Sequence, residues 1–369
     1  MAFTSVGWWP RLNPSDASGK RFPPFWLDSE NGRFLIANAA DASLLRAEIL
    51  AVNGVPIVSF LKPALDRNSG ETLAFKAARF VGSQELWFYM TDLFRDDSYT
   101  VKVRDEAGAD REQAVQTVGL EQFEELAPQK QRGQRTHVEF IDGARIARLV
   151  YPAFHESGAE KHKIDEIFRQ IKDRGTADLI IDLRGNGGGT SAMVQYIFPY
   201  LYDGKFWDFS IVRKKISPEL LAAFESESGP ASQMGKVVTY HGEEERFPKP
   251  ATFFTGRSYL LIDNETFSSA TEFATMFRDY KVGKSLGYET GGVPICFGDT
   301  LPFTLKSSGI RFGVSHKQFF PPKPKPGDDE HGMRPDIPMS AELLAPYRKE
   351  ADPVLTFTVA YIRKARGSK

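Results

Sequence analysis

The sequence is poor in cysteine and holds only Cys296 among its 369 residues. A lone thiol cannot form a disulfide within the chain, and it cannot build a cysteine-based zinc site. Long apolar runs are missing too, since no stretch approaches the ~20 apolar residues that a membrane-spanning helix needs. The chain starts without a basic region followed by an apolar one, so the start is unlike a secretory signal. These absences exclude a disulfide scaffold and predict no membrane span.

The balance of charge and the absent motifs exclude further classes. The formal net charge is −1, and no run of lysine and arginine is long enough to mark a nucleic-acid surface. The glycine patterns of nucleotide sites, G-x-G-x-x-G and G-x-x-x-x-G-K-[ST], do not occur. His155 and His162 do not form the H-E-x-x-H pattern of zinc peptidases. We therefore expect no nucleic-acid partner, no cofactor and no catalytic metal.

The length allows two or three domains, and an apolar content of 41% suffices for a substantial core. Residues 1–32 are rich in proline, serine, glycine and tryptophan and are predicted to form an irregular N-terminal arm. Residues 33–106 are predicted to form a small mixed domain, because Asn53-Gly54 between two apolar segments is a strong hairpin signal. Residues 107–369 are predicted to form the larger domain.

Strand and helix patterns alternate along the larger domain. Apolar residues at helical spacing from Ile164 to Ile171 predict an amphipathic helix. Short apolar runs predict strands, and two further segments predict helices, so that the domain should contain a largely parallel sheet. The predicted strands are Arg145–Tyr151, Leu179–Leu183 and Tyr259–Ile262, and the further helices are Ala192–Leu201 and Ala270–Phe277.

Chemically informative residues follow three of these strands. The segments after them are Tyr151–His155, Arg184–Gly189 and Asn264–Ser269. In parallel sheets, sites form beyond the carboxyl ends of the strands, so we expect the three segments to lie together. Three consecutive glycines allow backbone N–H groups to face a substrate oxygen without obstruction by side chains.

Ser269 stands where a strand passes into a helix. The backbone N–H groups of a first helical turn lack partners, and the helix dipole is positive there. A serine in this place can cap the helix, or it can act as a nucleophile whose developing oxyanion meets those donors. The residues around it leave both interpretations open.

Several segments together resemble peptidase family S41, the C-terminal processing or tail-specific serine peptidases. The blocks occur in the order of that family, and they cover roughly residues 33–340. They are EILAVNGVP (48–56), DLRGNGGG (182–189), SATEFA (269–274), GYETGG (287–292), SGI (308–310) and RPDI (334–337). The first block resembles the end of the PDZ-like module that these peptidases carry.

The resemblance implies an α/β fold with a ClpP/crotonase-like βαβ core and a smaller PDZ-like α+β domain upstream. It also implies a serine peptidase that acts on peptides or unfolded proteins, with Ser269 as the nucleophile. The oxyanion would be bound by the N–H of Ala270 and by one from Gly187–Gly189, of which Gly188 is the best placed. Glu272 would be a supporting carboxylate, and Thr290 would position the base or the substrate. Family habit favours a periplasmic or secreted location.

The sequence departs from the family at the general base. Relatives carry a lysine after the Thr-x-Gly of the GYETGG block, and this chain has Val293 there. A histidine can replace the lysine; among the six histidines, His155 is best placed because it follows a core strand beside the glycines. A carboxylate would then orient it, and the candidates are Asp328, Asp329, Glu330 and Asp336.

A lysine from a neighbouring segment can also reach the serine, with its pKa lowered far below ~10.4 by burial. The candidates are Lys281, Lys284 and Lys317, all expected in solvated loops. In a third interpretation, the chain has lost catalysis and binds an apolar small molecule or a peptide in the same groove. Retention of Ser269, Glu272 and the glycines argues against the loss of catalysis.

Overall fold

The chain is described by a computed structural model in which two compact units separate. One unit contains residues 7–133 and is called here the N-terminal unit; the other, the core unit, contains residues 1–6 and 134–369. The described residues are 4–6, 19–30, 32–81, 86, 90–91, 96–105, 107–126, 135–223 and 231–367. Residues 1–3 and 7–18 of the predicted N-terminal arm lie outside them.

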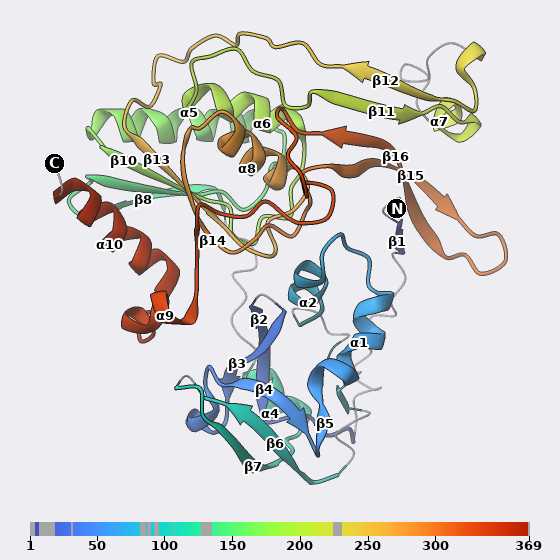
Figure 1. Cartoon of the computed structure of the whole chain (residues 1–369), viewed down its shortest axis with the longest axis vertical. Coiled ribbons are helices and arrows are strands. Elements are labelled where there is room, and N and C mark those ends of the chain that lie inside the picture. The colour runs from blue at the N-terminus through green and yellow to red at the C-terminus, as the bar shows by residue number, and fades with distance from the viewer. Residues whose placement is uncertain are drawn as a thin grey trace. The chain divides into compact units, whose positions relative to one another are not determined.

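An antiparallel sheet organises the N-terminal unit (Figure 1). Its strands follow the order β2-β3-β4-β6-β7, and β5 pairs with β4. Asn53 and Gly54 have φ angles of 46° and 76°, which confirms the predicted tight turn between β4 and β5. The bounds are β2 Phe25–Glu30, β3 Arg33–Ala39, β4 Glu48–Val52, β5 Val55–Pro56, β6 Ser98–Arg104 and β7 Asp110–Gln116.

The helices of the N-terminal unit pack on this sheet, and the two together enclose a separate hydrophobic core. Phe22 and Trp26 both stack with the ring of Phe123, each with 4.9 Å between ring centroids. The helices are α1 Ile57–Arg67, α2 Leu73–Val81 and α4 Leu120–Glu125. The unit uses β2 from the predicted arm and β7 from beyond residue 106. The expected boundaries at residues 32 and 106, and the PDZ-like character of this unit, stay predictions.

The core unit is built on a mixed sheet of order β17-β14-β13-β10-β9-β8 (Figure 1). All neighbouring pairs are parallel except β8 and β9. All five residues of β10 are buried, as expected for a strand covered on both faces. The bounds are β8 His137–Ile141, β9 Ile146–Val150, β10 Asp178–Asp182, β13 Arg257–Ile262, β14 Gly283–Gly287 and β17 Ile337–Pro338.

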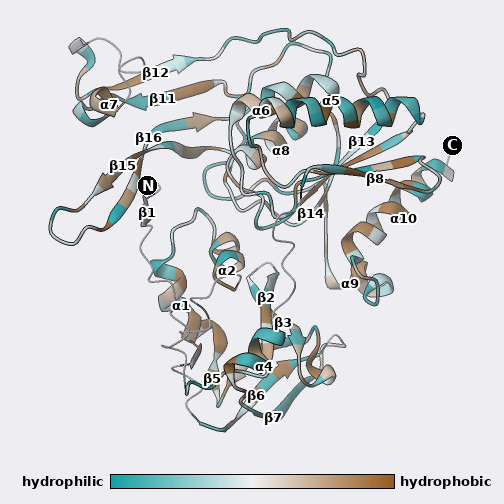
Figure 2. Cartoon of the chain, turned by 180° about the vertical axis from the view of Figure 1, so that it is seen from behind, coloured by the Kyte–Doolittle hydropathy of each residue, from teal (hydrophilic) through white to brown (hydrophobic). Residues whose placement is uncertain are grey.

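Helices cover both faces of this sheet. On one face lie α5 Gly158–Asp173, α6 Ser191–Ile197 and α8 Ser269–Asp279, whose apolar residues pack with Leu179 and Ile181. On the other face lie α9 Ala341–Leu344 and α10 Pro353–Gly367, which pack with Ile180. Figure 2 shows the polar side of α5 in teal, turned away from the brown strands. The mixed α/β fold predicted from the alternating patterns is therefore confirmed.

A second, antiparallel sheet belongs to the core unit. In it β16 pairs with β15 along its length, and with β1 and β11 as well. The short helix α7 Pro218–Ala223 lies beside it (Figure 1). The bounds are β1 Thr4–Val6, β11 Ile211–Lys215, β12 Val237–His241, β15 Cys296–Thr304 and β16 Arg311–Phe320. In the described part of the chain, no helix is long and apolar enough to cross a membrane.

Candidate active site

The turn before α8 holds Ser269 in a constrained place. Ser268 has φ 55° and ψ −126°, an uncommon conformation for a residue with a side chain, and α8 begins directly after it. Ser269 is 5% exposed. Among the described residues, none forms a hydrogen bond with its hydroxyl group. Ser269 therefore does not cap the helix, which removes the structural explanation for a serine at this position.

The glycine loop lies directly against this turn. Gly188 has φ 99°, and a Cβ atom on it would come within 2.7 Å of Ser268 Cβ and 2.9 Å of Ser269 N. Gly189 packs as closely on Phe154, where a Cβ would lie 2.1 Å from the carbonyl oxygen. Only glycine fits at either place. The structure thus brings together the two segments that the sequence predicts to converge.

Hydrogen bonds decide which glycine amides are available. The N–H of Gly188 donates to Asn186 Oδ1 at 2.8 Å, and the carbonyl of Gly188 accepts from Phe154 N at 2.9 Å. The N–H groups of Gly187 and Gly189, both exposed, donate no hydrogen bond to any described residue. Ala270 N donates to Phe267 O at 3.1 Å. The sequence favoured Gly188 as the oxyanion donor, but its N–H group is already hydrogen-bonded. Among the described residues, the N–H groups of Gly187 and Gly189 remain available as donors.

Asn186 is a residue of the site that the sequence argument did not single out. Its side chain donates to Tyr151 O at 2.7 Å, and its carbonyl accepts from Phe267 N at 2.9 Å. Together with its bond to Gly188, this fully buried amide joins the ends of β9, β10 and β13. Its place inside the DLRGNGGG block was the one available signal.

Glu272 lies one helical turn beyond Ser269 and is 9% exposed. Oε2 accepts from Ser191 Oγ at 2.7 Å, while Oε1 is buried with no hydrogen-bond partner in the described chain. Burial, and then the charge of Asp208, raise the pKa of this carboxyl group well above its ordinary value. Burial and the unsatisfied oxygen both favour the neutral carboxylic acid over the carboxylate. Ser191 carried no sequence signal for this contact.

His155 follows Phe154, whose main chain is bonded to the glycine loop. Its side chain is exposed, and no hydrogen bond or ion pair joins it to any described residue. Two of the expected orienting carboxylates are engaged elsewhere: Asp328 with Arg278 at 2.8 Å, and Asp336 with Ser285 N at 2.9 Å. Its role as a base stays a prediction.

The loop after β14 closes the site from another side. Thr290 is fully buried, and its hydroxyl donates to Gly292 O and accepts from Met333 N, each at 2.7 Å. The first bond lies within the loop, and the second joins the loop to the segment before β17. Gly292 packs on the turn, since a Cβ there would lie 2.7 Å from Thr271 Oγ1. Val293, in the position where relatives have lysine, is 6% exposed.

The expectation for the candidate lysines needs one correction. Lys284 lies in β14 and Lys317 in β16, so neither is in a loop. The side chain of Lys317 is 15% exposed, and its ammonium group lies 2.6 Å from Asp299 Oδ2. The strand position of Lys317 was missed because lysine is uncommon in a half-buried strand unless a carboxylate compensates its charge. In the described residues, no three acidic, histidine or cysteine side chains are grouped to hold a metal ion.

Comparison with known proteins identifies the family. The model of peptidase family S41 matches residues 145–339, which is more than half of the 369 residues. The chain belongs to peptidase family S41. No curated protein matches this S41 chain.

Solved structures share its fold. Mature CPAF has 15% sequence identity and a TM-score of 0.56, covering 88% of this S41 chain and 79% of CPAF. CPAF complexed with lactacystin has 15% sequence identity and a TM-score of 0.55, covering 88% of this chain and 80% of that one. The photosystem II D1 C-terminal processing protease has 14% identity and a TM-score of 0.40, covering 93% of this chain and 79% of the protease, and this TM-score is too low to establish likeness of fold. At these identities the CPAF structures establish likeness of fold.

Proposed function

We propose that this S41 chain is a serine peptidase that cleaves peptides or unfolded proteins through an acyl-enzyme on Ser269. The observation that carries the proposal is the close approach of Gly188 to Ser269, at the carboxyl ends of β10 and β13. Family membership supplies the reaction class. The uncommitted hydroxyl of Ser269 is suited to attack, because nothing in the described chain would have to release it.

The oxyanion would then meet the glycine loop. The free N–H groups of Gly187 and Gly189 are the donors on that side, and Ala270 supplies the amide at the start of α8. Ala270 N would exchange its 3.1 Å bond to Phe267 O for one to the substrate. His155 is the proposed base, as the exposed histidine beside this loop.

A fluorophosphonate probe tests the nucleophile. We expect the full chain to be labelled on Ser269, and Ser269→Ala to lose both labelling and cleavage of a casein substrate. Ser268→Ala is the matched control, since it removes the neighbouring hydroxyl and should still be labelled. Full activity of Ser269→Ala would refute the proposal. Preference for a peptide with a free C-terminal carboxylate over its amidated form would support C-terminal processing.

Val293, which stands where the family resemblance leads us to expect the lysine base, favours a second candidate, a catalytically inactive S41-like protein that binds an apolar small molecule or a peptide. Mass spectrometry of a solvent extract of the purified protein tests it. A co-purified apolar compound, together with no labelling of Ser269, would select this candidate over the peptidase.

A further inference from the structure

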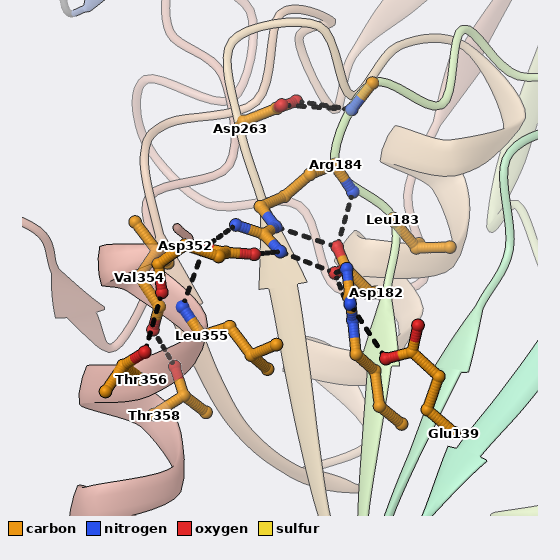
Figure 3. Close-up of polar contacts among 12 residues, drawn as sticks. Glu139, Asp182, Leu183, Arg184, Asp263, Asp352, Val354, Leu355, Thr356 and Thr358 are labelled. Atoms are coloured by element: carbon orange, nitrogen blue, oxygen red, sulfur yellow. Dashed lines mark hydrogen bonds and ion pairs between the residues drawn. The ribbon is translucent and has the colours of Figure 1, made fainter. Parts of the chain in front are cut away.

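Asp263 lies between the glycine loop and the turn of Ser269. It follows the last residue of β13 directly. Both of its carboxylate oxygens lie 3.0 Å from the N–H of Gly185, at the start of the glycine loop. Figure 3 shows this pair of contacts above the guanidinium group of Arg184. The carboxylate thus reaches across from one strand end to the next.

The same carboxylate also orders its own turn. Oδ1 accepts from Glu265 N at 3.0 Å and from Thr266 N at 2.9 Å. The hydroxyl of the fully buried Thr266 accepts from Asp263 N and lies 3.0 Å from Leu183 O, to which it can donate. The side chains of Asp263 and Thr266 together therefore order the turn and attach it to the residues that follow β10.

Burial raises the pKa of the Asp263 carboxyl group, whereas its hydrogen bonds from Gly185, Glu265 and Thr266 and the charge of Arg184 favour the ionised form. In that form the bonds from backbone N–H groups are charge-assisted, and such bonds are about twice as strong as neutral ones. They act three to six residues before Ser269, in the segment whose direction sets the start of α8. A shift of about 1 Å between a nucleophile and its oxyanion donors can cost about 10²-fold in rate.

We propose that Asp263 is a positioning residue, which holds the turn of Ser269 against the glycine loop and so sets the distance between the Ser269 hydroxyl and the free amides of Gly187 and Gly189. The proposal rests on the peptidase function proposed above. Asp263 touches no reacting atom in this account; it acts through Gly185 and Thr266.

Asp263→Asn tests the proposal, because it keeps the shape of the side chain but removes its charge and one acceptor. We expect kcat on a peptide substrate to fall at least about 10-fold, with KM within about threefold of the wild type. Fluorophosphonate labelling of Ser269 should slow by a similar factor. Hydrogen exchange at Gly185, Glu265 and Thr266 should become at least about 10-fold faster.

Asp178→Asn is the matched control. Asp178 is a fully buried acid at the other end of β10, bonded to Arg257 and Arg366. It should lower the midpoint of thermal unfolding while leaving kcat, labelling and exchange at Gly185 unchanged. A variant Asp263→Asn with wild-type kcat and wild-type exchange would overturn the proposal.

A variant that fails to fold and a failure of the peptidase function can be told apart. If Asp263→Asn does not fold, hydrogen exchange in the wild-type protein tests the proposal. Unprotected amides at Gly185, Glu265 and Thr266 would overturn it, and protected amides would support it. If Ser269→Ala keeps full activity, the peptidase function fails by itself. The exchange experiment then still decides whether Asp263 holds the two segments together.

Discussion

The backbone nitrogen of Ser269 lies so close to Gly188 that a single added carbon on the glycine would come within 2.9 Å of it. Roughly eighty positions separate the two residues in the sequence. They meet because β10 and β13 are paired in parallel, with Asp182 opposite Leu261, so that both strands end at the same edge. The contact explains why a side chain is excluded from the centre of the glycine loop.

Gly188→Ala should therefore disrupt both the loop and the turn. The new methyl group would meet Ser268 Cβ at 2.7 Å and Phe267 O at 2.8 Å, and alanine disfavours a φ of 99°. We expect a loss of about 2–4 kcal/mol in the free energy of unfolding, and loss of labelling at Ser269. Urea denaturation measures the first effect. Gly187→Ala is the stability control, because a Cβ at Gly187 meets nothing within 4 Å.

His155→Ala tests the proposed base. General-base assistance typically contributes ~10²–10⁴-fold, so kcat should fall by about 10²-fold or more. The unfolding midpoint should not change, because the side chain is exposed and makes no polar contact with a described residue. His162→Ala, on the exposed side of α5, is the control. A change in kcat of less than about threefold would exclude His155.

Much of the site-bearing fold was predictable because parallel strands leave strong local signals. The run Leu179–Leu183 matches β10 within one residue, and Tyr259–Ile262 falls inside β13. The antiparallel sheet was largely missed. Its edge strand β12 is mostly exposed, so its valines do not form a buried face, and β11 ends in the charged run Arg213-Lys214-Lys215.

The parallel strand pattern also predicted that the glycine loop lies close to Ser269. It did not predict the hydrogen bonds that fix the geometry of the site. The Asn186 side chain donates to the backbone carbonyl of Tyr151, and Glu272 accepts from the Ser191 hydroxyl, in each case between residues far apart in sequence. Such bonds depend on tertiary packing and leave no local pattern. The occupied amide of Gly188 is a different case, because its acceptor Asn186 Oδ1 lies only two residues earlier and the bond is a local side-chain-to-backbone one.

Glu272→Gln should stabilise the protein increasingly as the pH rises. The pKa of Glu272 is raised in the folded state, first by burial and then by Asp208. Above the ordinary glutamate pKa the folded state therefore binds more protons than the unfolded state, and wild-type stability falls with pH by up to about 1.4 kcal/mol per unit. Glutamine carries no charge and so does not lose stability as the pH rises, and its side-chain oxygen can still accept a hydrogen bond from the Ser191 hydroxyl.

The difference in unfolding free energy between Glu272→Gln and the wild type, measured in urea from pH 5 to 8, checks this expectation. It should grow as the pH rises. Glu124→Gln, which changes the same charge at an exposed position on α4, should give no such trend. A constant difference across that range would mean that Glu272 is already ionised.

Asp182 should show the opposite dependence on pH. Burial alone would raise its pKa, but the guanidinium groups of Arg184 and Arg148, each 2.7 Å from Oδ2, hold it below the ordinary value (Figure 3). The unfolded state then binds more protons, so the stability that Asp182 contributes is present above the ordinary aspartate pKa and is lost as the pH falls through its folded pKa. Asp182→Asn should cost about 3 kcal/mol near pH 7, because two largely buried guanidinium groups each lose one carboxylate partner. Arg148 keeps Glu139 and Arg184 keeps Asp352. Urea denaturation at pH 7 and pH 3 should show this cost shrinking in acid, whereas a cost independent of pH would show that packing, not charge, holds the network.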